Sequence, residues 1–394
     1  MIFLYVVFTI SLAALLVGGV LEQRRHDRNL ESIPVRVMVN GIRGKSSITR
    51  LCAGALRGGD MRVVAKTTGT AARFIFPDGA EMPVHRKFNI ANVAEQIGIV
   101  RQAAAEKPDA FVIECMAVMP ALQEINQEKL IRSNIGVLCN VREDHVAEMG
   151  PTLEDIARSL SRSMPHGEVC VTAESVWWPV LQEEADKRGC RLVYADPESV
   201  TDEEMDGFRF FTFKENVAIA IAVAREVGIN REDALRGMYE AAPDPGVLSV
   251  EPYQVAGKRI NLANVFAAND PNSTVMNFQR LLDVGDIRPP IFTLINCRPD
   301  RVERNGQMGA IVPDLLTDKL FVIGHPSRSA ITTVPEGWGG EIIDLGGDNR
   351  DPDEIFRSIL EHIPDHDASL IAIGNIHGQG ERLLEYLEEL GELR

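Results

Sequence analysis

The residues best suited to chemistry lie together in one short loop, Asn40-Gly41-Ile42-Arg43-Gly44-Lys45-Ser46-Ser47. The loop follows a run with the character of a buried strand and precedes a helical pattern. Glycines let the backbone turn its N–H groups toward phosphate oxygens, and the helix N-terminus adds partial positive charge. Lys45 can then reach the β- and γ-phosphates of a nucleotide, and the Ser46 hydroxyl is placed to bind Mg²⁺.

The loop therefore predicts an ATP-binding site. The alternative is a tight turn between a strand and a helix, with a solvated lysine. A Gly-Lys-Ser-Ser run at that place favours the nucleotide. The residues that we expect to contact ATP are Asn40, Gly41, Arg43, Gly44, Lys45, Ser46 and Ser47. Lys45 is also a predicted catalytic residue.

A carboxylate ends a second predicted strand, Ala110–Glu114. In α/β sheets ligands bind beyond the carboxyl ends of the strands. P-loop enzymes hold Mg²⁺ with an acid in this position. Glu114 is therefore a predicted metal ligand, together with Ser46, and a predicted catalytic residue. The alternative is an ordinary surface glutamate that follows a strand.

A third predicted strand, residues 134–140, leads into a polar segment that contains Asp144 and His145. A neutral imidazole is a common metal ligand. We predict that His145 is a metal ligand and a catalytic residue, with a structural histidine as the alternative.

These segments together resemble the Mur ligase superfamily, which includes the peptidoglycan stem-peptide ligases and the folylpolyglutamate synthases. The G-x-x-G-K-S-S spacing and Glu114 carry the resemblance, together with Asn140 followed, after three intervening positions, by Asp144-His145. It implies that His145 contributes to a second Mg²⁺ site beside the γ-phosphate. Many Mur enzymes also have a carbamylated lysine that bridges the two metals, whereas residues 157–163 contain no lysine.

The resemblance extends to residues outside these strands. It places Asn216 near the adenine, although an asparagine in the first turn of a helix is also a common cap. It implies that Arg301 is catalytic and closes over the ATP phosphates, which a planar guanidinium can pair bidentately. Three loop residues depart from the family pattern, and their roles stay open: Asn269, Asp270 and His377.

Two further segments carry weaker signals. Thr67-Thr68-Gly69-Thr70 resembles the Thr-x-Gly loop of the superfamily, or is an ordinary turn at a strand end. A basic stretch follows, and it is either a patch for a carboxylate substrate or a set of solvated charges. Its residues are Arg73, His85, Arg86 and Lys87.

The N-terminus predicts a membrane anchor. Residues 1–21 carry no charge, and as a helix they would span roughly 30 Å, enough to cross a bilayer. Arg24, Arg25 and Arg28 follow, so the positive-inside rule places the body of the protein in the cytoplasm. We expect a single-pass protein of the cell membrane, with a polar linker after the anchor. A buried core helix is the alternative.

The order of the predicted elements indicates an α/β protein. We expect an anchor and linker over residues 1–30 and a P-loop domain with a parallel sheet over residues 31–245. A Rossmann-like α/β domain is expected over residues 246–394. The proline-rich stretch from Ala242 to Gly246 is the expected hinge.

Composition excludes some functions and partners. The 394 residues carry a net charge of −16, which argues against nucleic acid as a partner. The six cysteines form no C-x-x-C pair and are typical of small buried side chains in a reducing compartment.

Within the superfamily, a membrane anchor directly before the P-loop domain is most similar to the ligase subunits of bacterial poly-γ-glutamate synthases, which act in capsule biosynthesis. The resemblance implies that ATP, with Mg²⁺ or Mn²⁺, converts a glutamate γ-carboxylate into an acyl phosphate. The amine of another glutamate then attacks. Implied partners are glutamate, the growing chain and membrane-embedded synthase subunits. The alternatives are a folylpolyglutamate-type ligase and a membrane-tethered P-loop ATPase for transport or regulation.

Overall fold

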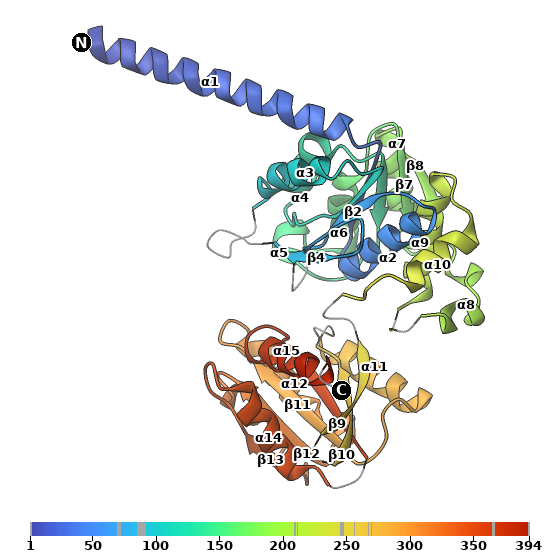
Figure 1. The fold of residues 1–394 in the computed structure, drawn as a ribbon, viewed down its shortest axis with the longest axis vertical. Coiled ribbons are helices and arrows are strands. Elements are labelled where there is room, and N and C mark those ends of the chain that lie inside the picture. Colours follow the sequence, from blue (N-terminus) through green and yellow to red (C-terminus); the bar gives the residue numbers. More distant parts are fainter. Residues whose placement is uncertain are drawn as a thin grey trace. The chain divides into compact units, whose positions relative to one another are not determined.

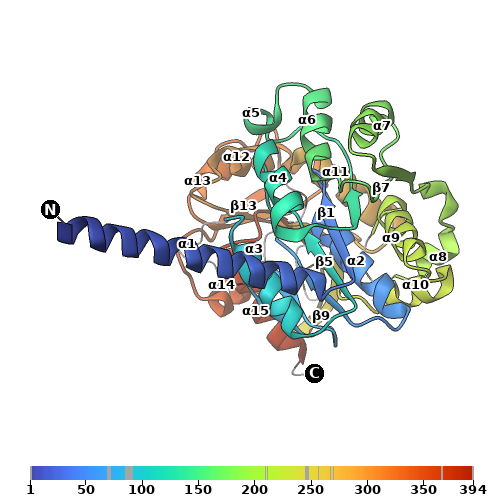
Figure 2. The same ribbon diagram turned by 90° about the horizontal axis from the view of Figure 1, so that it is seen from above.

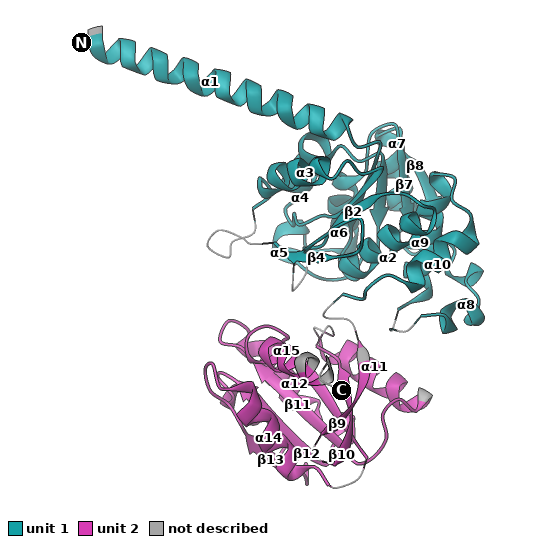
Figure 3. Cartoon of the chain, viewed as in Figure 1, with its two compact units in different colours: residues 1–244 teal, residues 245–394 magenta. Residues whose placement is uncertain are grey.

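Two units make up the chain, Met1–Asp244 (unit 1) and Pro245–Arg394 (unit 2) (Figure 3). A computed structural model describes residues 2–68, 72–84, 92–208, 210, 212–244, 248–255, 257–266, 268, 270–364 and 367–392. Gly69 and Thr70 of the Thr-x-Gly turn, the basic residues 85–87 and Asn269 therefore lie outside the described residues. Each unit is built on its own sheet, and the predicted α/β class is confirmed.

The N-terminal helix α1 (Ile2–Glu31) is unbroken, but its two parts have different surroundings. Its apolar part is exposed, projects from the rest of unit 1 and is long enough to cross a membrane (Figures 1 and 2). Its last turns are packed, since Leu30 is buried and His26 Nε2 lies 2.9 Å from the carbonyl oxygen of Leu130. The expected polar linker is thus wrong, because the helix continues and packs against unit 1.

The sheet of unit 1 has the strand order β4-β3-β2-β5-β1-β6-β7-β8. Neighbouring strands are parallel from β2 to β8, whereas β3 and β4 add an antiparallel edge that the sequence analysis did not predict. The strands are β1 (Val35–Asn40), β2 (Val63–Lys66), β3 (Arg73–Ile75), β4 (Glu81–Pro83), β5 (Ala110–Glu114), β6 (Ile135–Leu138), β7 (Val169–Thr172) and β8 (Arg191–Tyr194).

The central strands of this sheet are apolar on both faces, as expected for parallel strands that helices cover. Side chains alternate along β1, so Val37 and Val39 pack toward one helical layer and Met38 toward the other. The helices of unit 1 after α1 are α2 (Lys45–Gly58), α3 (Glu95–Ala105), α4 (Pro120–Ile125), the π-helix η2 (Asn126–Ile131), α5 (Val146–Met149), α6 (Leu153–Leu160), η3 (Ser161–Ser163), α7 (Trp178–Lys187), η4 (Pro197–Ser199), α8 (Asp202–Asp206), α9 (Lys214–Glu226) and α10 (Arg231–Tyr239).

Helix α2, which follows the P-loop, is fixed by a close crossing with α10. A Cβ atom on Gly54 would lie 2.6 Å from the carbonyl oxygen of Gly237, and one on Gly58 would lie 2.0 Å from that of Asp233. Only glycine permits this approach, so the crossing holds the P-loop helix against the core of unit 1.

Unit 2 has a second sheet, of order β13-β12-β11-β14-β10-β9, in which only β9 is antiparallel to its neighbour. Its strands are β9 (Ser249–Val255), β10 (Lys258–Asn264), β11 (Ile291–Cys297), β12 (Lys319–Gly324), β13 (Glu341–Asp344) and β14 (Ala368–Gly374). Its helices are α11 (Pro271–Val284), α12 (Val302–Ala310), η5 (Val312–Leu315), α13 (Arg328–Ile331), α14 (Pro352–His362) and α15 (Gln379–Glu392).

Candidate functional site

The predicted P-loop connects β1 to α2 at the carboxyl edge of the unit 1 sheet, and two glycines shape it. Gly41 has a φ of +138°, and a Cβ atom there would lie 2.8 Å from Cys139 Cβ. Gly44 has a φ of +78° and caps the N-terminus of α2. Glycine is therefore needed at Gly41, where the loop passes close to the end of β6, and the positive φ of both glycines lets the loop backbone turn its N–H groups toward a phosphate.

Lys45, the first residue of α2, is held by the loop itself. Its Nζ donates to the carbonyl oxygens of Gly41 at 2.8 Å and Ile42 at 3.1 Å. The ammonium group therefore lies over the loop whose backbone forms the cradle. It is placed to exchange these carbonyl contacts for phosphate oxygens.

Ser46 and Glu114 meet beneath the loop. The Ser46 hydroxyl donates to Glu114 Oε2 at 2.7 Å, and the backbone N–H of Thr68 donates to the same oxygen at 2.7 Å. Glu114 is only 2% exposed. A hydroxyl and a carboxylate are hard oxygen ligands of the kind that Mg²⁺ prefers, so the pair fits this ion.

Asn140 joins the third segment to the P-loop. Its Oδ1 accepts from the backbone N–H of Arg43 at 3.0 Å, and its Nδ2 donates to the carbonyl oxygen of Arg43 at 3.0 Å. The Arg43 guanidinium also pairs with Asp144 at 3.3 Å. Side chains that follow β6 therefore hold the middle of the P-loop. Sequence reasoning noted Asn140 in its motif but gave it no role.

His145 lies next to this contact, at the start of α5. Its φ is +50°, and its half-exposed ring has nitrogens 4.0 Å from carboxylate oxygens of Asp144 and Glu148. Within the described part of the chain, no three histidine, cysteine, aspartate or glutamate side chains gather as a metal site. The metal-ligand role of His145 therefore stays a prediction.

The remaining nucleotide predictions in unit 1 have different surroundings. Asn40 is buried, and its amide donates to Gln123 Oε1 at 2.8 Å, so its side chain makes a hydrogen bond inside unit 1. Asn216, in the first turn of α9, brings its Oδ1 within 3.7 Å of a Cβ position on Gly44. Ser47 is half-buried on the first turn of α2. Asn216 thus lies beside the P-loop, and its role at the adenine stays a prediction.

In unit 2, the predicted Arg301 caps the N-terminus of α12 and is exposed. Nearby, Asn296 at the end of β11 donates through Nδ2 to the carbonyl oxygens of Asn375 and, at 2.9 Å, His377. His377 Nδ1 lies 3.1 Å from a Glu381 carboxylate oxygen. The loops after β11 and β14 are therefore tied together at the carboxyl edge of this sheet.

Asp270 in unit 2 caps α11, because its Oδ1 accepts from the backbone N–H of Ser273 at 2.9 Å. This contact gives a structural role to Asp270, one of the three loop residues that differ from the family pattern.

Sequence reasoning missed two buried charged groups of unit 1. Glu174, which follows β7, accepts from the backbone N–H groups of Val141 and Val176, both at 3.0 Å. Arg50 on α2 is 4% exposed and pairs bidentately with Glu81. Neither had a motif around it. A charged residue within an otherwise buried helical face was the one available signal for Arg50.

Asp244, the last residue of unit 1, lies 3.5 Å from Arg50 Nε. Burial raises the pKa of Asp244 to about 6, although the Arg50 guanidinium opposes the shift.

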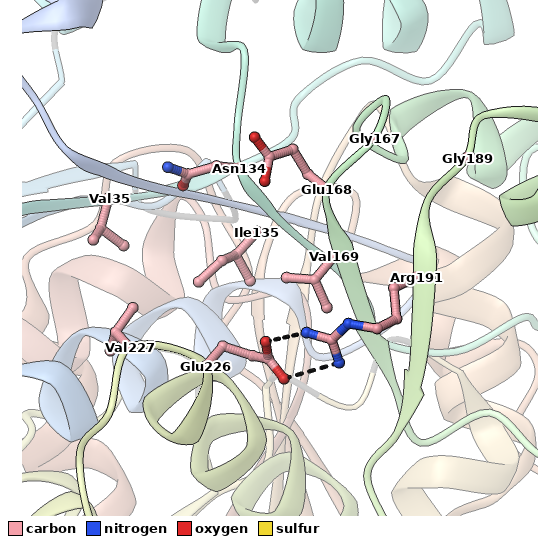
Figure 4. A pocket seen from close by; sticks show the side chains of 10 residues that line it. All are labelled: Val35, Asn134, Ile135, Gly167, Glu168, Val169, Gly189, Arg191, Glu226 and Val227. Carbon is pink, nitrogen blue, oxygen red and sulfur yellow. Dashed lines mark hydrogen bonds and ion pairs between the residues drawn. The ribbon is translucent and has the colours of Figure 1, made fainter.

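A cavity of about 350 Å³ lies away from these residues, at the amino ends of β1, β6, β7 and β8 (Figure 4). An ion pair between Arg191 and Glu226 crosses its lining. Because ligands of parallel sheets bind at the carboxyl ends of strands, this cavity is at the wrong edge for the predicted site.

Family models match two parts of the chain. The Mur ligase middle domain matches residues 39–231, and the C-terminal domain of poly-gamma-glutamate synthase CapB matches residues 250–390. The PGA synthase CapB of Bacillus subtilis (strain 168) is 37% identical over 384 residues, 96% of this chain and 97% of that protein. The capsule biosynthesis protein CapB of Bacillus anthracis is 36% identical over 394 residues, 99% of this chain and 83% of that protein.

Solved structures share the fold at low identity. E. coli FolC in complex with ADP has a TM-score of 0.67 and 14% identity, and the match covers 93% of this chain and 92% of FolC. A folylpolyglutamate synthase/dihydrofolate synthase from Yersinia pestis, complexed with AMPPNP and Mn ion, has a TM-score of 0.66 and 15% identity over 92% and 91% of the two chains. The folylpolyglutamate synthase-like fold thus covers both units.

Proposed function

Because the chain belongs to the Mur ligases, and within them to the CapB type of poly-γ-glutamate synthase, we propose that it is an ATP-dependent amide ligase that builds poly-γ-glutamate. The observation that carries the proposal is the grouping of Lys45 with the hydrogen-bonded pair of Ser46 and Glu114 at one sheet edge. Phosphoryl transfer needs a cationic cradle and oxygen ligands for a metal ion, and Lys45, Ser46 and Glu114 would supply these groups at this edge.

The reaction has two balanced steps. An oxygen of the γ-carboxylate at the chain end bonds to the γ-phosphorus of ATP, and the bond to ADP breaks, which leaves an acyl phosphate. The amine of the incoming glutamate then bonds to the acyl carbon, inorganic phosphate leaves, and the amine gives up a proton. When bound, ATP and Mg²⁺ supply the phosphoryl group and much of the charge neutralisation.

The chain's own residues position these reactants. Lys45 moves from the loop carbonyls to the phosphate oxygens and neutralises their charge. Ser46 and Glu114 hold the metal, and the Thr68 N–H keeps the Glu114 carboxylate aimed at Ser46. The clamp from Asn140 to Arg43 keeps the loop in its binding conformation.

Two further residues of unit 1 complete the proposed site: His145 would hold a second metal, and Asn216 would line the adenine side of the P-loop. Arg301, in unit 2, is proposed as a phosphate-binding residue. A guanidinium can hold phosphate through two parallel hydrogen bonds, and Arg301 is exposed at a helix N-terminus where an anion is favoured. Mn²⁺ is proposed as an alternative ion, because it also binds oxygen and imidazole ligands.

The proposed location is the cell membrane. The exposed apolar part of α1 would span the bilayer once, with both units in the cytoplasm, because Arg24, Arg25 and Arg28 flank it on the side of the body. Partner subunits that span the membrane would receive the growing anionic chain. The apolar span of α1 supports the proposed membrane location.

The function is tested with membranes that contain the protein and its partner subunits. They are incubated with ATP, Mg²⁺ and labelled glutamate, and both ADP and high-mass polymer are followed. We expect both products to depend on glutamate and to disappear in Lys45→Ala.

Two other results would overturn the choice of function. Folate-dependent ADP formation without a response to glutamate would indicate a folylpolyglutamate-type ligase. ADP formation that responds to a partner subunit but to no acceptor would indicate a tethered ATPase.

A further inference from the structure

Helix α4 carries a fully buried glutamine whose amide has a partner for every polar function. Gln123 Nε2 donates to the carbonyl oxygen of Val118 at 2.7 Å and to Ser159 Oγ at 3.2 Å. Its Oε1 accepts from Asn40 Nδ2 at 2.8 Å. The side chain is 0% exposed. Because all three contacts are made at once, the amide has one orientation, and its partners are fixed relative to each other.

Two of the three partners of Gln123, Asn40 and Val118, lie on the segments that form the proposed metal and nucleotide site, and the third, Ser159, lies on α6. Asn40 is the last residue of β1 and directly precedes Gly41, whose carbonyl oxygen holds Lys45. Val118 belongs to the segment that follows Glu114. One buried amide therefore connects the entry of the P-loop to the chain beyond the predicted metal ligand.

A residue of η3, Ser163, makes a second contact with Asn40. Asn40 Nδ2 also donates to Ser163 Oγ at 3.0 Å, and Ser163 in turn donates to the carbonyl oxygen of Leu160 at 2.7 Å. Asn40, Gln123, Ser159 and Ser163 are each at most 4% exposed. We name this set the Gln123 network. Buried networks of this kind are rigid when every member is satisfied, and leaving one member unpaired is costly.

We propose that Gln123 is a positioning residue for the Mg²⁺–ATP site. The pairing of β1 with β5 sets the distance between these strands, and Gln123 fixes Asn40, at the entry of the P-loop that carries Ser46, against the segment that follows Glu114, so that both oxygens meet one ion. Gln123 touches neither the metal nor the nucleotide. The inference rests on the nucleotide site of the proposed function, but it does not depend on which acceptor the enzyme uses.

A matched control lies four residues further along the chain. Gln127 is also buried, at 4% exposure, and its amide also bonds within unit 1. Its Nε2 donates to the carbonyl oxygen of Ser133 at 3.1 Å, and its Oε1 accepts from Ser133 Oγ at 2.7 Å. These contacts close the turn before β6 and involve no P-loop residue. Replacing Gln127 removes similar hydrogen bonds without touching the Gln123 network.

The experiment compares Gln123→Met with Gln127→Met in the full chain in detergent. Methionine keeps the length and the unbranched shape of glutamine but makes no amide hydrogen bonds. Binding of a fluorescent, non-hydrolysable ATP analogue is titrated against Mg²⁺, and thermal unfolding is measured on the same samples. Residues that orient metal ligands typically change metal affinity by 10–100-fold, so we expect Gln123→Met to raise the half-saturating Mg²⁺ concentration by about tenfold or more.

Gln127→Met should lower the unfolding temperature by about as much as Gln123→Met does, and it should leave the Mg²⁺ titration unchanged. If Gln123→Met does not fold, Ser163→Ala replaces it, because that variant removes one of the two contacts of the Asn40 amide and, besides it, only the Ser163 hydrogen bond to Leu160. It should shift the Mg²⁺ titration in the same direction by a smaller factor.

Equal Mg²⁺ titrations for the wild type and the Gln123 network variants would overturn the inference. So would an equal shift in Gln127→Met, because the effect would then be one of general stability. Failure of the wild-type chain to bind the analogue with Mg²⁺ would instead overturn the nucleotide site of the proposed function.

Discussion

The packing of α1 against unit 1 makes a prediction that separates a rigid anchor from a flexible tether. Leu30 is 2% exposed and belongs to a core cluster with Met38 of β1 and Phe111 of β5. Leu15 lies on the same helix but is 74% exposed. Replacing each leucine with alanine removes the same atoms from two different environments.

The magnitude follows from burial. A buried Leu→Ala substitution costs about 2–5 kcal/mol, because it removes apolar contacts and leaves a cavity. For a unit of this size, each kcal/mol lowers the unfolding temperature by roughly 2–4 °C. Leu30→Ala should therefore lower the unfolding temperature of unit 1 by about 6–12 °C, taking the cost as about 3 kcal/mol. Leu15→Ala should leave that temperature unchanged in detergent.

The assay is thermal unfolding of the full chain in one detergent, followed by near-UV circular dichroism. Equal unfolding temperatures for Leu30→Ala and Leu15→Ala would refute the reasoning. The end of α1 would then not be part of the core of unit 1, and the anchor would be joined to the enzyme by a flexible segment.

Three more predictions concern unit 1. Gly41→Ala should destabilise unit 1 more than Gly44→Ala, as measured by chemical denaturation. Both variants lose about 1–2 kcal/mol because the residue has a positive φ. A Cβ atom at Gly41 would also lie 2.8 Å from Cys139 Cβ, whereas the nearest atom to a Cβ at Gly44 is 3.7 Å away. Glu114→Gln should lower glutamate-dependent turnover by about 100-fold or more, because it removes the negative charge from the pair of proposed metal ligands, Ser46 and Glu114. Steady-state kinetics at saturating Mg²⁺ would measure this loss. Asp244→Asn should gain stability relative to the wild type as the pH rises from 4 to 7, by about 2–3 kcal/mol, as unfolding at several pH values would measure.

The sign of the Asp244 effect follows from its raised pKa. An aspartate carboxyl group ordinarily has a pKa of 3.8, whereas that of Asp244 is about 6 in the folded state, so the folded state binds more protons between these values. The stability of the wild type therefore falls over this range as the pH rises, and asparagine removes that fall. A stability difference that is independent of pH would contradict this explanation. Equal destabilisation by the two glycine variants, or unchanged turnover in Glu114→Gln, would contradict the other two predictions.

The sequence predicted the elements whose patterns are local. The apolar runs of β1, β5 and β6 and the glycine spacing of the P-loop identified three segments. The rule that ligands lie beyond the carboxyl ends of strands then brought Ser46 and Glu114 to one edge, where the structure pairs them. A local pattern and a topological rule were sufficient for this part of the site.

The parts that the sequence did not predict depend on contacts between distant residues. Asn140 reaches Arg43 across 97 positions, and Gln123 reaches Asn40 across 83. No periodicity or residue spacing in the sequence indicates either contact. The docked end of α1 was missed for another reason, since His26 and Leu30 are buried within a segment rich in charge. Its composition indicated a linker, and only the packing partner makes it part of the core.

Oxygen labelling can show whether the γ-carboxylate of the chain end becomes an acyl phosphate. The synthase membranes are supplied with oligo-γ-glutamate whose carboxylates carry ¹⁸O, together with unlabelled ATP, glutamate and water. We expect the inorganic phosphate released during elongation to carry ¹⁸O from the carboxylate, and Lys45→Ala to release no such phosphate. Elongation that releases only unlabelled phosphate would show that the carboxylate never bonded to phosphorus, and it would rule out an acyl phosphate intermediate.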